Sequence, residues 1–105
     1  MKDPEVVLSD LAVADVFAQA DWYELRSDYK LAIRWERAVT STVLRLVRMP
    51  QSGAPCRFKS ELLRDIRRLP VTGFPQVIFY RFRDNQIHVL RVLHGARDLE
   101  RLFAE

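Results

Sequence analysis

A series of cationic side chains in the second half of the chain has residue types and spacings that suit anion binding. The residues are Arg64, Arg67 and Arg68 in one segment, Arg81 and Arg83 in the next, and Arg91, His94 and Arg97 in the last. If these segments are neighbouring strands, several guanidinium groups converge on one region, where they can bind phosphate or carboxylate in a bidentate manner. The aromatic side chains nearby suit stacking on RNA bases, although Tyr80 fits a core position better; these are Phe79, Tyr80 and Phe82. The alternative is that the arginines are solvated at strand edges, where they prevent aggregation, and spacing alone favours neither interpretation.

The sequence lacks the usual signatures of catalytic and metal-binding sites. Its three glycines lie too far apart for a phosphate-binding loop. The basic neighbours of Cys56 can lower the pKa of its thiol, but an ordinary loop thiol is the simpler interpretation. His88 and His94, six residues apart on one predicted strand, share a face but are too far apart to bind one metal ion. We therefore expect neither a metal ion nor a cofactor.

Two helices are predicted in the first half of the chain, after a short strand at Glu5–Ser9. Ser9 and Asp10 offer an N-cap to a helix that should end near Leu25 or Arg26. Ser27 and Asp28 then offer a second cap, which indicates two tightly joined helices rather than one long helix. The segment 49–55 contains two prolines and a glycine, so it should end the second helix and form a loop.

The second helix has one apolar and one basic face. The apolar face is formed by Ala32, Trp35, Val39, Thr42, Val43, Leu46 and Val47. The opposite face carries Lys30, Arg34, Arg37, Ser41, Arg45 and Arg48. We expect the first face to pack on the core and the second to face solvent or an acidic partner.

The remaining chain predicts strands at 61–70, 76–82 and 87–93. The segment 72–75 is a turn between the first two strands, and residues 83–86 form a hairpin connection between the last two. His94, Gly95 and Ala96 interrupt the last strand, and residues 97–103 suit a short closing helix. The order β-α-α-β-β-β predicts an α+β fold in which a helical hairpin packs on one face of a small, mostly antiparallel sheet.

The last two predicted strands are apolar on both faces, which one helical layer cannot cover. Val77, Phe79 and Val89 cannot all lie on the same side as their apolar neighbours in these strands. We expect the second face to be covered either by the ends of the chain or by a partner.

The composition is that of one globular domain over residues 1–105, with 49% hydrophobic and 30% charged residues. The single cysteine excludes an internal disulfide, and no apolar run is long enough for a membrane span. The first residues lack the features of a secretory signal, so we expect a cytoplasmic protein with no membrane partner. The charge is uneven: residues 1–24 carry one basic and six acidic groups, whereas the other 81 residues carry 16 basic and 8 acidic groups. This asymmetry indicates either an acidic or nucleic-acid partner or simply a well-solvated basic surface.

Two segments resemble the RelE/ParE superfamily of bacterial type II toxins, and the ParE branch most closely. The first segment, residues 66–81, has the sequence IRRLPVTGFPQVIFYR, and the second, residues 89–99, has the sequence VLRVLHGARDL. The two occur at the separation usual for the family. The N-terminal strand, helical hairpin and Pro-Gly loop also fit, so the resemblance covers nearly the whole chain.

The resemblance implies the α+β fold inferred above and a toxin that is encoded beside its antitoxin. An amphipathic helix and an extended stretch of the antitoxin are expected to wrap around the toxin. An acidic antitoxin segment would complement the basic face of the second helix. The candidate antitoxin-binding residues are therefore Lys30, Arg34, Arg37, Arg45 and Arg48.

Two activities occur among proteins that resemble this chain. RelE-like members are ribosome-dependent mRNA endonucleases, and ParE-like members inhibit DNA gyrase. The endonucleases are expected to place an arginine early in the third strand and a tyrosine in the terminal segment, where this chain has Pro75-Gln76 and Phe103. Phenylalanine has no ionisable proton and cannot act as a general acid or base.

These departures favour a gyrase inhibitor that binds its target and is not an enzyme. The alternatives are a RelE-like endonuclease that acts on mRNA at the ribosome and an inactive module that only binds the antitoxin. His94 has the further interpretation that it stabilises a turn at Gly95. The candidate target-binding residues are Arg81, Arg91, His94 and Arg97.

Overall fold

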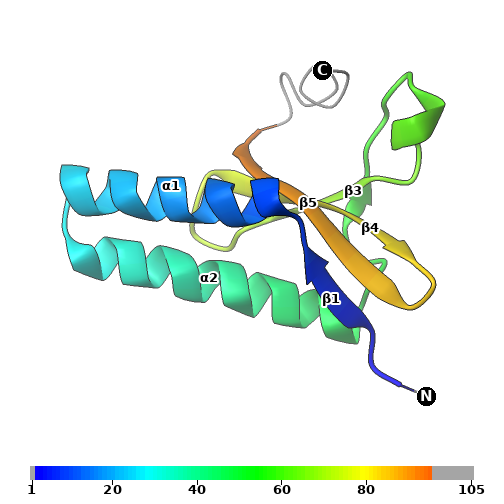
Figure 1. The fold of residues 1–105 in the computed structure, drawn as a ribbon, viewed down its shortest axis with the longest axis horizontal. Helices are drawn as coiled ribbons and strands as arrows, with labels where there is room; N and C mark the ends of the chain where they lie inside the picture. Colours follow the sequence, from blue (N-terminus) through cyan, green and yellow to red (C-terminus); the bar gives the residue numbers. More distant parts are fainter. Residues whose placement is uncertain (1, 96–105) are drawn as a thin grey trace.

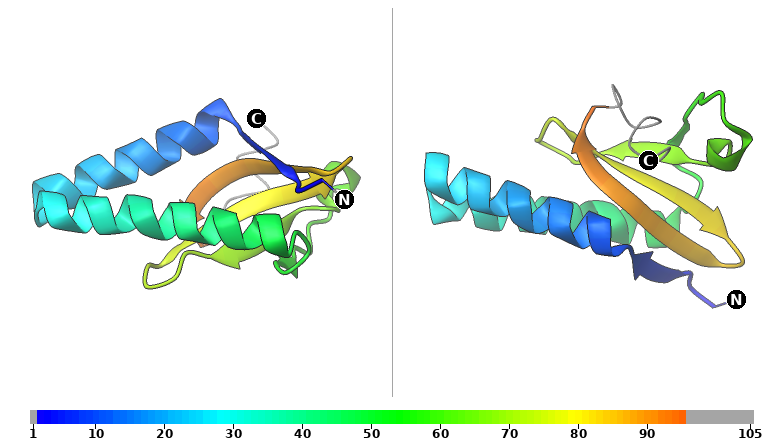
Figure 2. Two further views of the ribbon diagram at one scale, coloured as in Figure 1. Left: turned by 90° about the horizontal axis from the view of Figure 1, so that it is seen from below. Right: turned by 45° about the horizontal axis from the view of Figure 1, so that its top comes forward.

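The computed structural model describes residues 2–95 and places two helices on one face of a five-stranded sheet (Figures 1 and 2). The α+β class and the β-α-α-β-β-β core predicted from the sequence are confirmed. The elements are β1 (Glu5–Leu8), α1 (Asp10–Arg26), α2 (Tyr29–Arg48), β2 (Ala54–Pro55), the 3-10 helix η1 (Glu61–Leu63), β3 (Arg67–Pro70), β4 (Gln76–Arg83) and β5 (Gln86–His94). Within residues 2–95, no helix is long and apolar enough to cross a membrane.

Both helices begin at the caps that the sequence predicts. The Ser9 side chain accepts a hydrogen bond from the Ala12 N–H, and Asp28 accepts one from the Leu31 N–H. Each bond satisfies an amide that has no partner inside its helix. The two helices lie together on one side of the sheet and meet at the turn that joins them (Figure 2).

The strand order is β1-β5-β4-β3-β2, and β1 is parallel to β5 whereas the other pairs are antiparallel. The β4–β5 hairpin turns at Asp84 and Asn85, which both have positive φ, as a two-residue turn of this handedness requires. Residues 72–75 form the predicted turn before β4. The sheet is therefore mixed but mostly antiparallel.

The main core lies between the helices and the sheet. Trp35 and Leu46 of α2 are fully buried against Ile78 and Tyr80 of β4 and Ile87 of β5. The Trp35 ring N–H donates to the Val16 carbonyl oxygen at 3.0 Å, which joins the two helices. The apolar face predicted for the second helix is thus its core face, and the prediction that Tyr80 is a core residue is confirmed.

A second, smaller core lies on the other face of the sheet. Its fully buried residues are Ile66 and Phe79, and half-buried side chains pack around them; these are Cys56, Phe58, Leu63, Val77, Leu90 and Leu93. Much of the cover comes from the segment 56–66, which carries η1 and lies beside β3 (Figure 1). The sequence predicts cover from the chain ends or from a partner. Within the described residues an internal segment supplies it, and the closing helix predicted at 97–103 lies outside them.

The segment 61–70 is not one strand, so this prediction is wrong in part. It begins with η1 and becomes a strand only at Arg67, because Leu63 and Ile66 both turn toward the second core. Residues 54–55 of the predicted loop form the short strand β2, where Ala54 pairs with Arg68 and Pro55 with Arg67.

A β-bulge interrupts β5. Phe79 lies opposite Arg91 and Tyr80 opposite Val89, so Leu90 has no partner on β4. As a result Val89 and Val92, three residues apart, both join the main core. The bulge changes which face each later β5 side chain occupies.

Candidate functional site

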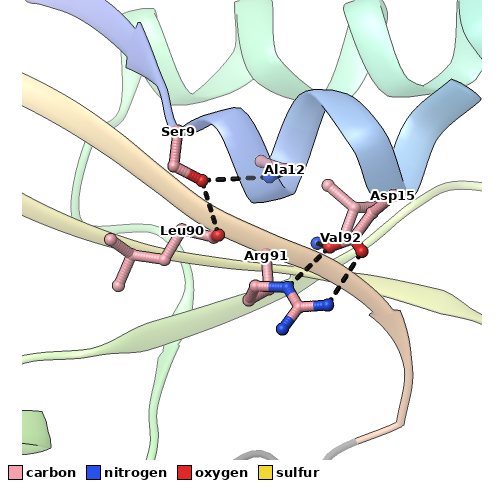
Figure 3. A network of polar contacts seen from close by, with 6 residues as sticks. All are labelled: Ser9, Ala12, Asp15, Leu90, Arg91 and Val92. Atoms are coloured by element: carbon pink, nitrogen blue, oxygen red, sulfur yellow. Dashed lines mark hydrogen bonds and ion pairs between the residues drawn. The ribbon is translucent and has the colours of Figure 1, made fainter. Parts of the chain in front are cut away.

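The N-terminal part of α1 lies against the outer edge of β5, where β1 ends (Figure 3). The Ser9 hydroxyl donates to the Leu90 carbonyl oxygen at 2.7 Å and also accepts from the Ala12 N–H. One turn further, the Asp15 carboxylate accepts a hydrogen bond from the Val92 N–H at 2.9 Å. The N-cap residue of α1 and a side chain in its first half therefore satisfy backbone groups of β5 next to the bulge.

Asp15 also forms a bidentate ion pair with Arg91. The Arg91 Nε donates to one Asp15 oxygen at 2.8 Å, and a terminal guanidinium nitrogen donates to the other at 2.9 Å. The hydrogen bond to Asp15 raises the pKa of Arg91 above its ordinary value, against the effect of burial. The two side chains are only 14% and 12% exposed. Arg91, a predicted target-binding residue, is thus held on α1 by an internal partner.

A cleft of about 700 Å³ opens beside this pair, between α1 and the ends of β4 and β5. Its lining includes Asp15, Trp22, Tyr23, Gln76 and His94. Trp22 and His94 are exposed, whereas Gln76 is only 5% exposed. The Tyr23 hydroxyl donates to the Gln76 side-chain oxygen at 3.3 Å, so α1 holds the first residue of β4 in place. We take this cleft, called the β5-end cleft below, as the candidate functional site.

The two histidines lie on opposite faces of the sheet, so the prediction that they share a face is wrong. His94 lines the β5-end cleft together with residues of α1. His88 precedes Val89, which points into the main core, so His88 points to the other side. The bulge at Leu90 breaks the alternation on which the prediction depended. Among the described residues, no group of three His, Cys, Asp or Glu side chains could hold a metal ion.

The predicted arginine cluster does not form one site. Arg81 and Arg83 both reach Asp65, at 3.1 and 2.6 Å, and Arg81 also donates to the Leu62 carbonyl oxygen. Burial works against ionisation of Asp65, but the Arg83 hydrogen bond and the charges of both arginines outweigh it and keep the pKa of Asp65 below its usual value. These contacts attach the segment 56–66 to β4.

Three further cations of the predicted cluster are also dispersed. Arg64 pairs with Glu61 at 2.9 Å, and Arg67 donates to the carbonyl oxygens of Gln51 and Gly53. Arg68 lines a different, smaller cleft. The last member, Arg97, lies outside the described residues. Of the seven members that lie within residues 2–95, Arg91 and His94 come together near the β5-end cleft.

The basic face of α2 is exposed over its whole length, as the sequence predicts. Lys30, Arg34, Arg37 and Arg48 point to solvent, and Arg45 donates to the Thr72 hydroxyl at 3.1 Å. Beside this face lies an apolar groove of about 350 Å³ between α1, α2, β1 and β5, whose lining includes Val13, Phe17, Val39, Val43 and Leu44. Arg37 lines a shallow hollow that continues along α2 past Leu44. The helical hairpin thus presents an apolar groove with positive charge along one side.

These arrangements suit binding better than covalent chemistry. The imidazole of His94 has no hydrogen bond or ion pair with the described residues. Among the described residues that line the β5-end cleft, Asp15 is the one carboxylate, and it is bound to Arg91 and Val92. Burial raises the pKa of the Cys56 thiol and outweighs the lowering effect of Arg68, so the net shift is opposite to the one that basic neighbours alone would give. The aromatic residues predicted to stack on bases include Phe79, which is fully buried and unavailable.

Sequence reasoning missed four residues of the cleft: Asp15, Trp22, Tyr23 and Gln76. Asp15 and Arg91 are 76 positions apart, and no local pattern links them. Trp22 was detectable, because a large aromatic residue at a polar helix position is unusual, and it is 50% exposed here. It stacks under Arg26, whose guanidinium carbon lies 5.3 Å from the ring centroid.

Comparisons with known proteins agree with this fold. Residues 6–99 match a family model described as the ParE toxin of the type II toxin-antitoxin system parDE. The structure of a chromosomal ParDE toxin-antitoxin system from P. aeruginosa is similar, with a TM-score of 0.74 and 19% identity over 89% of this chain and 97% of that one. The RelBE2 toxin-antitoxin complex from Mycobacterium tuberculosis has a TM-score of 0.60 at 19% identity, covering 90% and 100% of the two chains.

A YoeB/ParE toxin from Agrobacterium tumefaciens has a TM-score of 0.56 at 12% identity, over 88% of this chain and 99% of that one. At these identities the solved structures establish the fold alone. No curated protein matches the chain in sequence.

Proposed function

Because the chain belongs to the ParE toxin family of type II toxin-antitoxin systems, we propose that it inhibits DNA gyrase, and so blocks replication and growth, until an antitoxin neutralises it. The observation that carries the choice of target is the state of Gln76. Where the endonucleases are expected to have an arginine, this chain has an amide that is buried and bonded to Tyr23. A side-chain amide carries no charge and does not ionise near neutral pH, so it cannot act as a general acid or base and supports binding rather than RNA cleavage.

We place the contact with gyrase at the β5-end cleft. His94 is exposed at its mouth and Trp22 on its α1 side, so an aromatic surface and a hydrogen-bonding imidazole are both accessible. Aromatic residues are frequent centres of binding energy in protein interfaces. Arg91 acts here as a positioning residue, because its pair with Asp15 fixes α1 against β5. Arg97 follows in the chain, outside the described residues, and stays a candidate contact.

Arg81 has a weaker claim as a target contact. Its guanidinium is bound to Asp65 and to the Leu62 carbonyl oxygen on the other face of the sheet. A target would have to break these contacts to use it. We therefore assign Arg81 to the attachment of the segment 56–66.

We propose that a cognate antitoxin binds along the helical hairpin. The apolar groove between α1 and α2 suits the apolar side of an amphipathic helix, and the basic face of α2 suits acidic side chains next to it. Replacing Arg34, Arg37 and Arg45 with glutamate should slow association, since charge complementarity acts mainly on the on-rate. Unchanged association at low salt would contradict this placement.

The activity is tested with purified toxin in two assays. In the first, gyrase and plasmid DNA are incubated with toxin, and supercoiling and protein-linked DNA breaks are measured. In the second, translating ribosomes receive the toxin and their mRNA is examined for cleavage. We expect DNA breaks and lost supercoiling in the first assay and intact mRNA in the second. Ribosome-dependent cleavage would establish the endonuclease instead, and no effect in either assay would leave an inactive antitoxin-binding module.

The two histidines offer a matched pair of variants. His94→Gln should weaken gyrase inhibition several-fold, whereas His88→Gln, on the other face of the sheet, should leave it unchanged. Equal loss in both variants would exclude the β5-end cleft as the contact surface. Thermal unfolding of both variants checks that neither is destabilised, which also tests the alternative in which His94 only supports the turn at Gly95.

A further inference from the structure

A small cleft on the sheet face opposite the helices gathers positive charge, and no carboxylate of residues 2–95 lines it. It has a volume of about 370 Å³ and is lined by Pro55, Cys56, Arg57, Phe58 and Arg68. We call it the Arg57–Arg68 cleft. The cleft is separate from the β5-end cleft, with which it shares no lining residue.

Local structure explains why the two arginines meet. The Cys56 N–H donates to the Ile66 carbonyl oxygen at 2.8 Å, which continues the β2–β3 pairing by one step. Arg57 follows directly after this bond, and Arg68 lies on β3 opposite Ala54, so both arginines reach the same cleft. Both arginines are exposed, so neither pays a large desolvation cost for its charge.

The acidic residues nearby are already occupied. Asp65 is shared by Arg81 and Arg83, and Glu61 pairs with Arg64. Within residues 2–95, the side chains of Arg57, Arg68 and Lys59 have no hydrogen bond or ion pair. Three free cations therefore remain in one short region, and two of them line the same cleft.

The geometry points to a phosphate-binding site, and we propose that the Arg57–Arg68 cleft binds the phosphodiester backbone of duplex DNA. Two guanidinium groups around one polar cleft suit a tetrahedral oxyanion, which accepts several charge-assisted hydrogen bonds at once. Lys59 adds a third charge that can contact a neighbouring phosphate. The choice of DNA rests on the proposed function, because duplex DNA is the substrate of gyrase.

The charge distribution of the whole chain supports a polyanion at this end. Residues 1–24, which form β1 and most of α1, carry a net charge of −5. The segment 56–66 projects beside β3, on the side of the sheet away from the turn between the helices (Figure 1). The Arg57–Arg68 cleft and the basic face of α2 therefore both attract a polyanion, whereas the acidic side of α1 repels it.

The binding test uses the full-length toxin and a labelled short DNA duplex, without gyrase. We expect binding that weakens steeply between about 50 and 200 mM salt. The variant Arg57→Gln/Arg68→Gln should flatten the slope of log affinity against log salt by about 1.8, since each lost phosphate contact contributes about 0.9. The control Lys2→Gln/Arg26→Gln removes the same charge elsewhere and should change the slope little. An equal decrease in the salt slope for both variants would mean that DNA binding depends only on net charge, which would overturn the proposed site.

Cys56 gives a readout inside the cleft, because it is the only cysteine of the chain. Bound duplex should slow the alkylation of Cys56 by iodoacetamide, and Arg57→Gln/Arg68→Gln should abolish this protection. The variant Arg57→Lys/Arg68→Lys keeps the charge but loses the planar donors, so DNA should protect Cys56 in this variant only in part. Alkylation that is unaffected by DNA would overturn the proposal.

Two further ligands distinguish the source of the anion. Single-stranded RNA of equal length and a polyglutamate peptide should each bind more weakly than the duplex. If the RNA bound more strongly than the duplex, the ligand of the cleft would be RNA and the DNA proposal would be overturned. If the polyglutamate peptide bound more strongly, the ligand would be an acidic protein segment. Since gyrase is absent from these measurements, their failure leaves the gyrase assay intact, and failure of the gyrase assay leaves a measured DNA affinity standing.

Discussion

Removal of the Asp15 carboxylate should destabilise the toxin more than the loss of any surface ion pair. Asp15 makes three hydrogen bonds, two to the Arg91 guanidinium and one to the Val92 N–H. Asp15→Ala leaves a mostly buried guanidinium without a counter-ion and a backbone N–H without an acceptor. Asp15→Asn removes the charge but keeps an oxygen that can accept from Val92.

The magnitude follows from the burial of the pair. Exposed ion pairs contribute about 0–1 kcal/mol, and removing one partner of a fully buried pair costs about 3–5 kcal/mol. Side chains that are 14% and 12% exposed lie between these limits. We expect Asp15→Ala to lower the free energy of unfolding by about 3 kcal/mol and Asp15→Asn by about 2 kcal/mol. At about 4 °C per kcal/mol, the alanine variant should lose roughly 12 °C in Tm.

The assay is urea unfolding followed by tryptophan fluorescence. Trp35 is fully buried and bonded to the Val16 carbonyl oxygen of α1, so its emission reports whether α1 stays in place. The double variant Asp15→Ala/Arg91→Met removes both charges. Its loss in free energy of unfolding should be smaller than the sum of the two single-variant losses by about 1–3 kcal/mol. That coupling isolates the ion pair from the loss of side-chain volume.

The same measurement decides what Arg91 is available to do. A loss below about 1 kcal/mol for Asp15→Ala would mean that the pair behaves as a solvated surface pair. Arg91 would then be free to contact a target directly, and its assignment as a positioning residue would be refuted. A loss near the expected value, with strong coupling, supports that assignment.

Three other perturbations test the way the segments around the sheet are held. Gly53→Ala places a methyl group 2.6 Å from the Tyr80 hydroxyl oxygen and should cost about 1–3 kcal/mol in urea unfolding; a neutral result would contradict the close approach. Asp65→Asn should make the free energy of unfolding less sensitive to acid. The pKa of Asp65 in the folded state is below the usual 3.8, so its contribution to stability is complete above pH 3.8 and is lost as the pH falls through the folded-state pKa. The check is urea unfolding of both proteins at a series of acidic pH values, where parallel curves would oppose the assignment. Asn85→Val puts a β-branched residue at a φ of 58° and should lower Tm by several degrees; calorimetry that shows no decrease would exclude the two-residue turn.

Features of the fold that depend on neighbouring residues were predictable from the sequence. The caps at Ser9 and Asp28 bond to amides three positions ahead, so both helix starts follow from short patterns. The amphipathic pattern of α2 likewise identified its buried face, including Trp35 and Leu46.

Features that depend on distant residues were not predictable in the same way. Residues 61–66 have an ambiguous local pattern, and the need to cover Phe79 on the far face of the sheet decides their structure. The bulge at Leu90 is invisible in the sequence, because the strand is apolar on both faces and a shift of one residue leaves no mark on such a pattern. One unpaired residue was enough to place His88 and His94 on opposite faces.

The location of acidic residues explains why the arginine pattern identified a site only in part. Spacing along the predicted strands does not reveal which guanidinium groups already have an acidic partner. In the structure, Asp15 pairs with Arg91, and Asp65 pairs with Arg81 and Arg83. A cation that already has a partner stabilises the fold, and a cation without one remains available to an external anion.

By this criterion only one of the two arginines of the Arg57–Arg68 cleft, Arg68, belongs to the cluster that sequence spacing favours. Arg57 lies in a loop outside every predicted strand, whereas Arg68 was grouped with Arg64 and Arg67 in one predicted strand. These two arginines nevertheless share a cleft that no carboxylate of the described residues lines. The availability of each arginine depends on contacts with segments far away in the sequence. For this toxin the anion-binding surface therefore follows from the positions of its carboxylates as much as from those of its arginines.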